Sequence, residues 1–274
     1  MSAPVEVDDP GDPRLADYIG LKDADLRRAV EEPGAGGQGI FIAEGELVVR
    51  RLLGSGFGVR SVLVTPKGLA ALGALLDGVA HPVYVANQAV MNAVAGFNIH
   101  RGVLASALRG PAVDPAALVA SARRVAVTEA VTDHENLGGI FRNAAAFGLD
   151  AVLLSPECCD PFYRRCIRVS IGHVLSVPSA RLAAWPGGIG WLRAEGFYVV
   201  ALTPGAGAAD IRSLGLGARD RVAFLLGTEG PGLSAAALSA ADAAVRIPIA
   251  AGVDSLNVAS AAAVAFYEGS RPGS

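Results

Sequence analysis

Two stretches near the end of the chain share one pattern, and this pattern constrains the fold more than any other feature of the sequence. Each has a short apolar run, then a glycine-bearing loop, then the start of a helical pattern. They are Phe224-Leu-Leu-Gly-Thr-Glu-Gly-Pro-Gly-Leu-Ser234 and Ile247-Pro-Ile-Ala-Ala-Gly-Val-Asp-Ser-Leu-Asn-Val-Ala-Ser260. Short apolar runs of this kind are typical of buried parallel strands. Ligands of parallel α/β folds bind outside the carboxyl ends of the strands, so these two loops form the expected ligand site.

The alternation of strand and helix patterns extends through residues 122–274. Six strands are predicted, at Arg124–Thr128, Ala151–Leu154, Val174–Val177, Tyr198–Leu202, Val222–Leu226 and Ala244–Pro248. Helices are predicted between and after them, at Asn136–Phe147, Phe162–Arg168, Ile189–Glu195, from about Leu233, and at Leu256–Glu268. Strands that alternate with helices in this way predict a doubly wound, mainly parallel α/β sheet.

A smaller α/β domain is predicted over residues 21–109. Its helices are expected at Lys22–Glu32, Glu44–Leu53, Gly68–Leu76 and Asn87–Val94, and its strands at Ser61–Val64, Val83–Val85 and Val103–Ala107. Residues 1–20 are polar and proline-bearing, which indicates a lead-in segment. Residues 110–121 have two prolines and little charge, which indicates a linker between the domains. Gly34, Gly36 and Gly39 match the G-x-G-x-x-G spacing of dinucleotide-binding loops, but they follow a helical pattern instead of a strand, so the match is rejected.

Three motifs in the second domain resemble those of the SpoU (TrmH-like) RNA ribose 2′-O-methyltransferases of the SPOUT superfamily. They are Asn136-Leu-Gly-Gly-Ile-Phe-Arg142-Asn-Ala-Ala-Ala-Phe-Gly148, Leu226-Gly-Thr-Glu229-Gly-Pro-Gly-Leu233, and Ile247-Pro248 followed by Ser255-Leu-Asn257-Val-Ala. Their order and spacing agree with the family over roughly residues 120–270. The shorter phrases Phe41-Ile-Ala-Glu-Gly-Glu46 and His100-Arg-Gly-Val-Leu104 resemble the L30e-like RNA-binding domain that precedes the methyltransferase domain. The resemblance also implies a trefoil knot, which strand and helix patterns alone do not predict.

The resemblance implies that the protein transfers a methyl group from S-adenosylmethionine to a ribose 2′-hydroxyl. The RNA would be ribosomal RNA, with transfer RNA as the nearer alternative, and the enzyme would be a homodimer. The cofactor would be held mainly by main-chain groups of the second and third motifs. The expected contacts are Leu202, Thr203, Leu226, Gly227, Gly230, Ile247, Pro248, Leu256 and Asn257. From the residues alone, Gly227, Gly230 and Gly232 are also explained as turns with positive φ.

Five polar residues of the motifs are the catalytic candidates: Asn136, Arg142, Glu229, Ser255 and Asn257. The resemblance implies that Arg142 acts on the ribose hydroxyl. Guanidinium groups do not give up their proton in proteins, so we expect Arg142 to clamp the phosphate and ribose and to stabilise the developing alkoxide. Glu229 would orient Arg142 through a charge-assisted hydrogen bond. The structural alternatives are a helix cap for Asn136 and for Ser255, and a favourable helix N-terminal charge for Glu229.

RNA contacts are expected from five further residues, namely His100, Arg101, Arg164, Arg165 and Arg168. Arginine makes forked contacts to phosphate groups and stacks on bases. A solvated helix face is the alternative for the three arginines between 164 and 168. The formal net charge of −3 neither supports nor excludes an RNA partner.

Several other classes of protein are excluded or disfavoured. The chain has no run of about 18 apolar residues that would span a membrane. Its acidic N-terminus lacks the layout of a signal peptide, so a cytoplasmic protein is expected. No CxxC pair exists and the four histidines are scattered, so no metal site is expected. An oxidoreductase on this sheet would need a glycine fingerprint after Thr128, which is missing. A non-catalytic RNA-binding protein that retains the fold is the other rival function.

Overall fold

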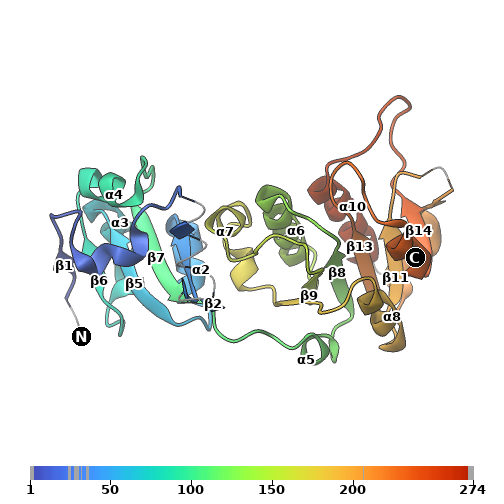
Figure 1. Ribbon diagram of the computed structural model, residues 1–274, viewed down its shortest axis with the longest axis horizontal. Coiled ribbons are helices and arrows are strands. Elements are labelled where there is room, and N and C mark those ends of the chain that lie inside the picture. Colours follow the sequence, from blue (N-terminus) through green and yellow to red (C-terminus); the bar gives the residue numbers. More distant parts are fainter. Residues whose placement is uncertain are drawn as a thin grey trace. The chain divides into compact units, whose positions relative to one another are not determined.

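The computed structural model describes residues 3–23, 26–27, 31, 33–34, 37–205 and 207–270 (Figure 1). The chain forms two compact units. The first contains residues 1–111 and 162–175, and the second contains residues 112–161 and 176–274. Much of the predicted helix Lys22–Glu32, and Gly36 of the rejected glycine motif, lie outside the described residues. Within the described residues, no helix combines the length and the apolar character needed to cross a membrane.

The second unit is built on a seven-stranded sheet in which every strand pair is parallel. Its strand order is β10-β9-β8-β13-β11-β14-β12. The strands are β8 (Arg124–Thr128), β9 (Ala151–Leu154), β10 (Ser179–Arg181), β11 (Tyr198–Leu202), β12 (Ala209–Asp210), β13 (Val222–Leu226) and β14 (Ala243–Arg246). All five residues of the central strand β13 are buried. A strand that is buried on both faces has a continuous run of apolar residues, and this pattern in the sequence predicted β13.

Helices cover both faces of this sheet, as a doubly wound fold requires (Figure 1). The helices are α5 (Pro115–Val119), α6 (His134–Ala146), α8 (Gly187–Ala194), α9 (Ala235–Ala240) and α10 (Val258–Ser270), with short 3₁₀ turns η4 (Ile211–Leu214) and η5 (Leu216–Ala218). Apolar residues of α5, α8 and α9 share one core with alternate residues of β8, β11 and β13. On the opposite face, Phe266 of α10 packs edge-on against Phe224. Helices α6 and α10 lie side by side there, because Gly139 leaves room for Ala259.

The predicted fold class of this unit is confirmed, but three details of the prediction are wrong. The predicted strand Val174–Val177 is a 3₁₀ turn, η3 (His173–Leu175), and the strand begins later as β10. The edge strand β12 was missed because it has only two residues. The predicted linker 110–121 contains α5, whose N-cap Asp114 accepts a hydrogen bond from the amide of Ala116. Val119 at its end is fully buried, so this half of the segment belongs to the core.

The first unit has a five-stranded mixed sheet with strand order β1-β6-β5-β7-β4. Its strands are β1 (Val5–Glu6), β4 (Ile40–Glu44), β5 (Val59–Val64), β6 (Val83–Val85) and β7 (Val103–Leu108). Strand β7 runs antiparallel to both β4 and β5. Its helices are α2 (Glu46–Leu53), α3 (Pro66–Leu72), α4 (Gln88–Ala95) and α7 (Arg164–Val169), with 3₁₀ turns η1 (Pro13–Tyr18), η2 (Gly73–Leu76) and η3. A separate antiparallel pair joins β2 (Pro33–Gly34) and β3 (Gly37–Gln38).

The interpretation of residues 1–20 as a lead-in is wrong. Strand β1 pairs in parallel with β6, and Leu15 and Tyr18 are fully buried in the core of the first unit. The hydroxyl of Tyr18 lies 2.9 Å from the carbonyl oxygen of Ser61 and 2.7 Å from its hydroxyl. This segment therefore contributes to the first domain, because Val7, Leu15 and Tyr18 are buried in its core.

The segment Phe162–Leu175 also departs from the predicted domain boundaries, since the prediction of 122–274 as one domain assigned it to the second. The ring of Phe162 packs against those of Phe41 and Phe57, with centroids 5.3 and 5.6 Å away. Arg164 forms an ion pair with Glu44, and both side chains are largely buried. The aromatic contacts and the ion pair explain why α7 groups with the first unit.

Candidate active site

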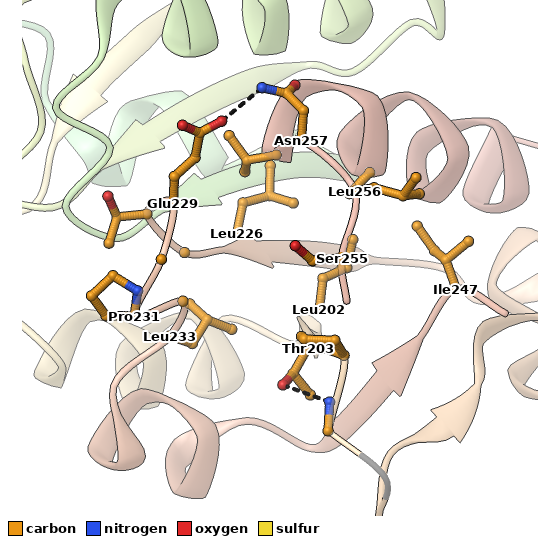
Figure 2. A pocket seen from close by; sticks show the side chains of 18 of the residues that line it. Leu202, Thr203, Leu226, Glu229, Pro231, Leu233, Ile247, Ser255, Leu256 and Asn257 are labelled. Atoms are coloured by element: carbon orange, nitrogen blue, oxygen red, sulfur yellow. Dashed lines mark hydrogen bonds between the residues drawn. The ribbon is translucent and has the colours of Figure 1, made fainter. Parts of the chain in front are cut away.

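A pocket of about 670 Å³ lies at the carboxyl ends of β11, β13 and β14 (Figure 2). Three loops line it, at residues 202–205, 226–233 and 247–257. Figure 2 shows Leu202, Leu226 and Leu256 around it, with Glu229 and Asn257 at one end. Pockets that hold small molecules are of this size, and parallel sheets place them at this edge.

Eight of the nine residues expected to contact the cofactor line this pocket: Leu202, Thr203, Leu226, Gly227, Gly230, Ile247, Leu256 and Asn257. The ninth, Pro248, is exposed and is not among the lining residues. Its two neighbours, Ile247 and Ile249, do line the pocket. The structure thus brings together residues that are up to 55 positions apart in the sequence.

The backbone of the loop 227–233 folds back tightly on itself. Glycine is required in this loop for two different physical reasons. Gly230 and Gly232 have φ of 80° and 71°, which favours glycine. Gly227 has no such φ. A Cβ at that position would lie 2.4 Å from the carbonyl carbon of Gly232, so close packing of two backbone segments excludes a side chain there. The amide of Gly232 donates a hydrogen bond to the carbonyl oxygen of Thr228, 3.1 Å away, which closes the loop.

Asn257 connects the three motifs. Its side-chain nitrogen donates to Oδ1 of Asn136 and to Oε1 of Glu229, both at 2.7 Å (Figure 2 shows the second bond). Its side-chain oxygen accepts from the amides of Ala259 and Ser260, at 2.9 and 3.2 Å. Asn257 therefore also caps helix α10. Each polar atom of this side chain has two partners, so its orientation is set by four hydrogen bonds.

Two of the capping alternatives are wrong. Ser255 does not cap the final helix, because α10 begins at Val258 and Asn257 supplies the acceptor. Ser255 lines the pocket instead. Asn136 does not cap α6, because Oδ1 of Asp133 accepts the amides of residues 135 and 136. Asn136 lies buried in the first turn and contacts Asn257.

Arg142 lies on α6, where it is exposed. It does not line the pocket, and no hydrogen bond or ion pair joins it to another of the residues described. The expected bond between Glu229 and Arg142 is therefore not formed within one chain. Glu229 accepts its hydrogen bond from Asn257 instead. The guanidinium of Arg142 remains available for a partner outside the chain.

The five expected RNA contacts all lie in the first unit. Arg164 already has partners within the protein. It forms an ion pair with Glu44, and its guanidinium lies 4.8 Å from the ring centre of Phe97. The alternative of a solvated position is wrong for this residue, whose side chain is 15% exposed, and its contact with RNA phosphate stays a prediction. Four others are exposed, namely His100, Arg101, Arg165 and Arg168.

Sequence reasoning missed Glu129, which follows β8 directly. The residue is 7% exposed, and its carboxylate accepts hydrogen bonds from the main-chain amide and hydroxyl of Ser234 and from the indole nitrogen of Trp185. Its position in the sequence could have identified it, because it is an acidic residue that directly follows a buried strand, where parallel sheets place their ligand sites.

The chemistry of the lining suits S-adenosylmethionine. Among the described residues that line the pocket, Glu229 carries the only charge, and the others are apolar, small or uncharged. Apolar walls with exposed main-chain groups match an adenine ring and a methionine chain. Among the residues that the structure describes, no three of His, Cys, Asp or Glu are placed to hold a metal ion.

Comparison with known proteins identifies the family. Residues 123–267 match the model of the SpoU rRNA methylase family. A Mycobacterium bovis protein named as an uncharacterized tRNA/rRNA methyltransferase is 49% identical over 269 residues, which cover 98% of this chain and 92% of that protein. A Bacillus subtilis 23S rRNA guanosine 2′-O-methyltransferase is 36% identical over 56% of this chain and 60% of its own length. The AdoMet-bound rRNA methyltransferase of Sinorhizobium meliloti is 27% identical and has a TM-score of 0.79, with 96% of each chain covered. The chain therefore belongs to the SpoU rRNA methylase family and is an S-adenosylmethionine-dependent RNA methyltransferase.

Proposed function

We propose that the methyl acceptor is a ribose 2′-hydroxyl of ribosomal RNA and that the pocket at the ends of β11, β13 and β14 holds the cofactor. The observation that carries this proposal is the bonding of Asn257, which joins residues of all three motifs beside the pocket. A 23S rRNA 2′-O-methyltransferase among the relatives supports the choice of acceptor and of RNA. Transfer RNA is the second candidate, because the name of the Mycobacterium bovis relative, which matches 98% of this chain, includes both transfer RNA and ribosomal RNA.

S-adenosylmethionine supplies an electrophilic methyl group, and the protein has to hold the acceptor oxygen in line with it. Gly230 and Gly232 of the pocket loop have no side chain to cover their main-chain groups, which leaves these groups free for contacts with the adenine and the methionine chain. The bonds among Asn136, Asn257 and Glu229 hold the second and third motif loops in a fixed relation before any ligand arrives. Such preorganisation lowers the barrier because less ordering remains to be done in the transition state.

Arg142 acts on the RNA in this proposal. Its guanidinium clamps the phosphate and ribose of the target nucleotide and stabilises negative charge as it develops on the 2′-oxygen. The 2′-hydroxyl proton goes to water or to a phosphate oxygen, since a guanidinium has no free site for a proton. The support for this role is the exposed position of Arg142 and its lack of a bond to another described residue.

We propose further that the enzyme is a homodimer in which Arg142 acts at the partner's pocket. Within one chain, Glu229 is bonded to Asn257 and not to Arg142. Helix α10, which packs against the helix of Arg142, leaves Val264 and Tyr267 with 41% and 53% of their surface exposed. Exposed apolar side chains on paired helices favour an interface between two copies.

The first unit is proposed to be the L30e-like RNA-binding domain. Arg101 lies beside Gly45, at the same sheet edge as Glu44, to which Arg164 of α7 is bound. Exposed His100, Arg101 and Arg168 offer contacts to RNA phosphates at this unit's surface. The protein would act in the cytoplasm.

The test is transfer of tritium from labelled S-adenosylmethionine to ribosomal RNA and, separately, to transfer RNA. Arg142→Ala is compared with the wild type, and Arg193→Ala, an exposed arginine of the second unit paired with Asp242, is the matched control. Alkali-resistant label in ribosomal RNA, lost with Arg142→Ala and kept with Arg193→Ala, is the expected result. Label found only in transfer RNA would establish the second candidate, and alkali-sensitive or base-borne label would overturn ribose methylation.

A further inference from the structure

Glu129 is bonded to both ends of the pocket loop 227–233. Its main-chain amide donates to the carbonyl oxygen of Leu226, 2.8 Å away, just before the loop. Its carboxylate accepts the amide of Ser234 at 2.8 Å and the hydroxyl of Ser234 at 2.7 Å, just after the loop. All seven residues of the loop line the pocket, whereas Glu129 does not. One residue outside the pocket thus fixes the distance between the two ends of the loop.

The carboxylate of Glu129 accepts hydrogen bonds on both of its oxygens. The indole nitrogen of Trp185 donates a third hydrogen bond to it at 2.5 Å. Burying a carboxylate is costly unless hydrogen bonds replace its water, and here three donors do so. Two of the three donors belong to Ser234, which also caps α9 through the amide of Ala237 at 3.1 Å. The carboxylate therefore couples the end of the loop to the start of the next helix.

We propose that Glu129 is a positioning residue for S-adenosylmethionine. Its carboxylate holds loop 227–233 in the conformation that binds the cofactor, and it acts through Ser234 and Trp185 without touching cofactor or RNA. This inference rests on the proposed function in one respect, that the pocket is the cofactor site. A residue with this role sets the affinity for the cofactor and leaves the chemical step unchanged once the cofactor is bound.

Glu129→Gln is the variant that tests it. Glutamine keeps the size of the side chain but replaces one acceptor oxygen with an NH₂ group. At least one of the three donors from Ser234 and Trp185 would then face this NH₂ group and lose its acceptor. The matched control is Asp150→Asn. Oδ2 of Asp150 accepts the amides of Arg123 and Arg124 at the opposite end of β8, at 2.7 and 2.8 Å. Both variants lose a carboxylate that anchors main-chain amides, but only Glu129 anchors an amide that adjoins the pocket loop.

Three quantities are measured for each protein: the melting temperature, the dissociation constant of S-adenosylmethionine by calorimetry, and amide exchange of the peptide spanning 227–234 without cofactor. The expected result for Glu129→Gln is a dissociation constant raised about tenfold or more, with faster exchange in that peptide. The rate at saturating cofactor should stay within about threefold of the wild type. Asp150→Asn should melt lower but bind the cofactor as the wild type does.

Cofactor affinity within twofold of the wild type in Glu129→Gln, with a melting temperature lowered as in Asp150→Asn, would overturn the inference. If Glu129→Gln does not fold, Ser234→Ala decides. It removes one donor and should weaken cofactor binding about threefold, and unchanged binding would again overturn the inference. A wild-type protein that binds no cofactor would refute the proposed pocket itself, which is a different failure from a loop that is insensitive to Glu129.

Discussion

The side-chain nitrogen of Asn257 lies 2.7 Å from Oε1 of Glu229, and this bond joins the third motif to the second beside the pocket. The same nitrogen lies 2.7 Å from Oδ1 of Asn136 in the first motif. A single amide group therefore fixes the relative positions of three segments, which lie 28 and 121 positions from one another along the sequence. An exposed asparagine with this many partners is expected to serve the site as well as the helix that it caps.

Replacing Asn257 should separate these two roles. Asn257→Asp keeps the oxygen that caps α10 but loses the donor and places a carboxylate beside Glu229. We expect its melting temperature to stay near that of the wild type, with methyl transfer reduced at least tenfold. Asn257→Ala also loses the cap, which costs about 1 kcal/mol of unfolding free energy. Equal losses of stability in both variants, measured by denaturant unfolding, would contradict the separation.

Gly227→Ala should damage the pocket without removing a polar group. Its Cβ would lie 2.4 Å from the carbonyl carbon of Gly232, so the loop backbone has to move. We expect cofactor binding to weaken at least tenfold, as measured by calorimetry. Gly190→Ala in helix α8 is the matched control, because its Cβ meets no atom within 4 Å. That change should leave binding intact and stabilise the protein by about 0.5–1 kcal/mol.

Arg142→Lys tests the forked contact proposed for this side chain. Lysine keeps the charge but cannot make two parallel hydrogen bonds to a phosphate. We expect methyl transfer to fall about tenfold in Arg142→Lys and about 100- to 1,000-fold in Arg142→Ala. Both variants should have the melting temperature of the wild type, because Arg142 has no bond to another described residue that would be lost. A lysine variant with full activity would show that charge alone suffices.

If the proposed dimer is formed through the exposed face of α10, a charged residue introduced on this face should convert dimers into monomers. Val264→Glu places a carboxylate on a helix face that the proposal buries between two copies. We expect sedimentation to show dimers for the wild type and monomers for this variant, with loss of methyl transfer. Leu108→Glu, an equally exposed apolar residue of the first unit, should remain dimeric. Monomers in the wild type would refute the dimer.

Cys159 gives a prediction about alkaline pH. Burial, with Cys158 as the next contribution, raises the pKa of its thiol to about 12. At pH 8 its thiolate fraction is about a thousandfold lower than that of an ordinary cysteine, so it should react slowly with thiol reagents in the folded state. The unfolded chain loses this proton at lower pH than the folded one. Stability should therefore fall as the pH rises from about 9 towards 12, and less so in Cys159→Ser. Denaturant unfolding at pH 8 and pH 10.5 measures the difference.

The sheet of the second unit was predictable because its strands are buried on both faces. Strand β13 is a run of five buried apolar residues, and its boundaries match the prediction. The pocket was predictable for the same reason, since parallel strands place their following loops at one edge. Strand β12 was not, because two residues carry no periodic pattern.

Side-chain partners were much less predictable than elements. The roles of Asn136 and Asn257 depend on a bond across 121 positions, which no local pattern reveals. Local capping rules gave the wrong caps for α6 and α10, because Asp133 and Asn257 lie closer to the true helix starts. The placement of α7 depends on the packing of Phe162 against Phe41 and Phe57, which forms only after the chain has folded.

The most direct test of the account is cofactor binding in three proteins, measured by calorimetry with S-adenosylmethionine. Leu256→Arg puts a bulky positive group into the pocket from a position that is 38% exposed, so the fold should tolerate it. We predict that the wild type and Arg142→Ala bind the cofactor with the same affinity and that Leu256→Arg does not bind it. Wild-type affinity in Leu256→Arg would contradict the account, because the cofactor would then lie outside the pocket at the ends of β11, β13 and β14.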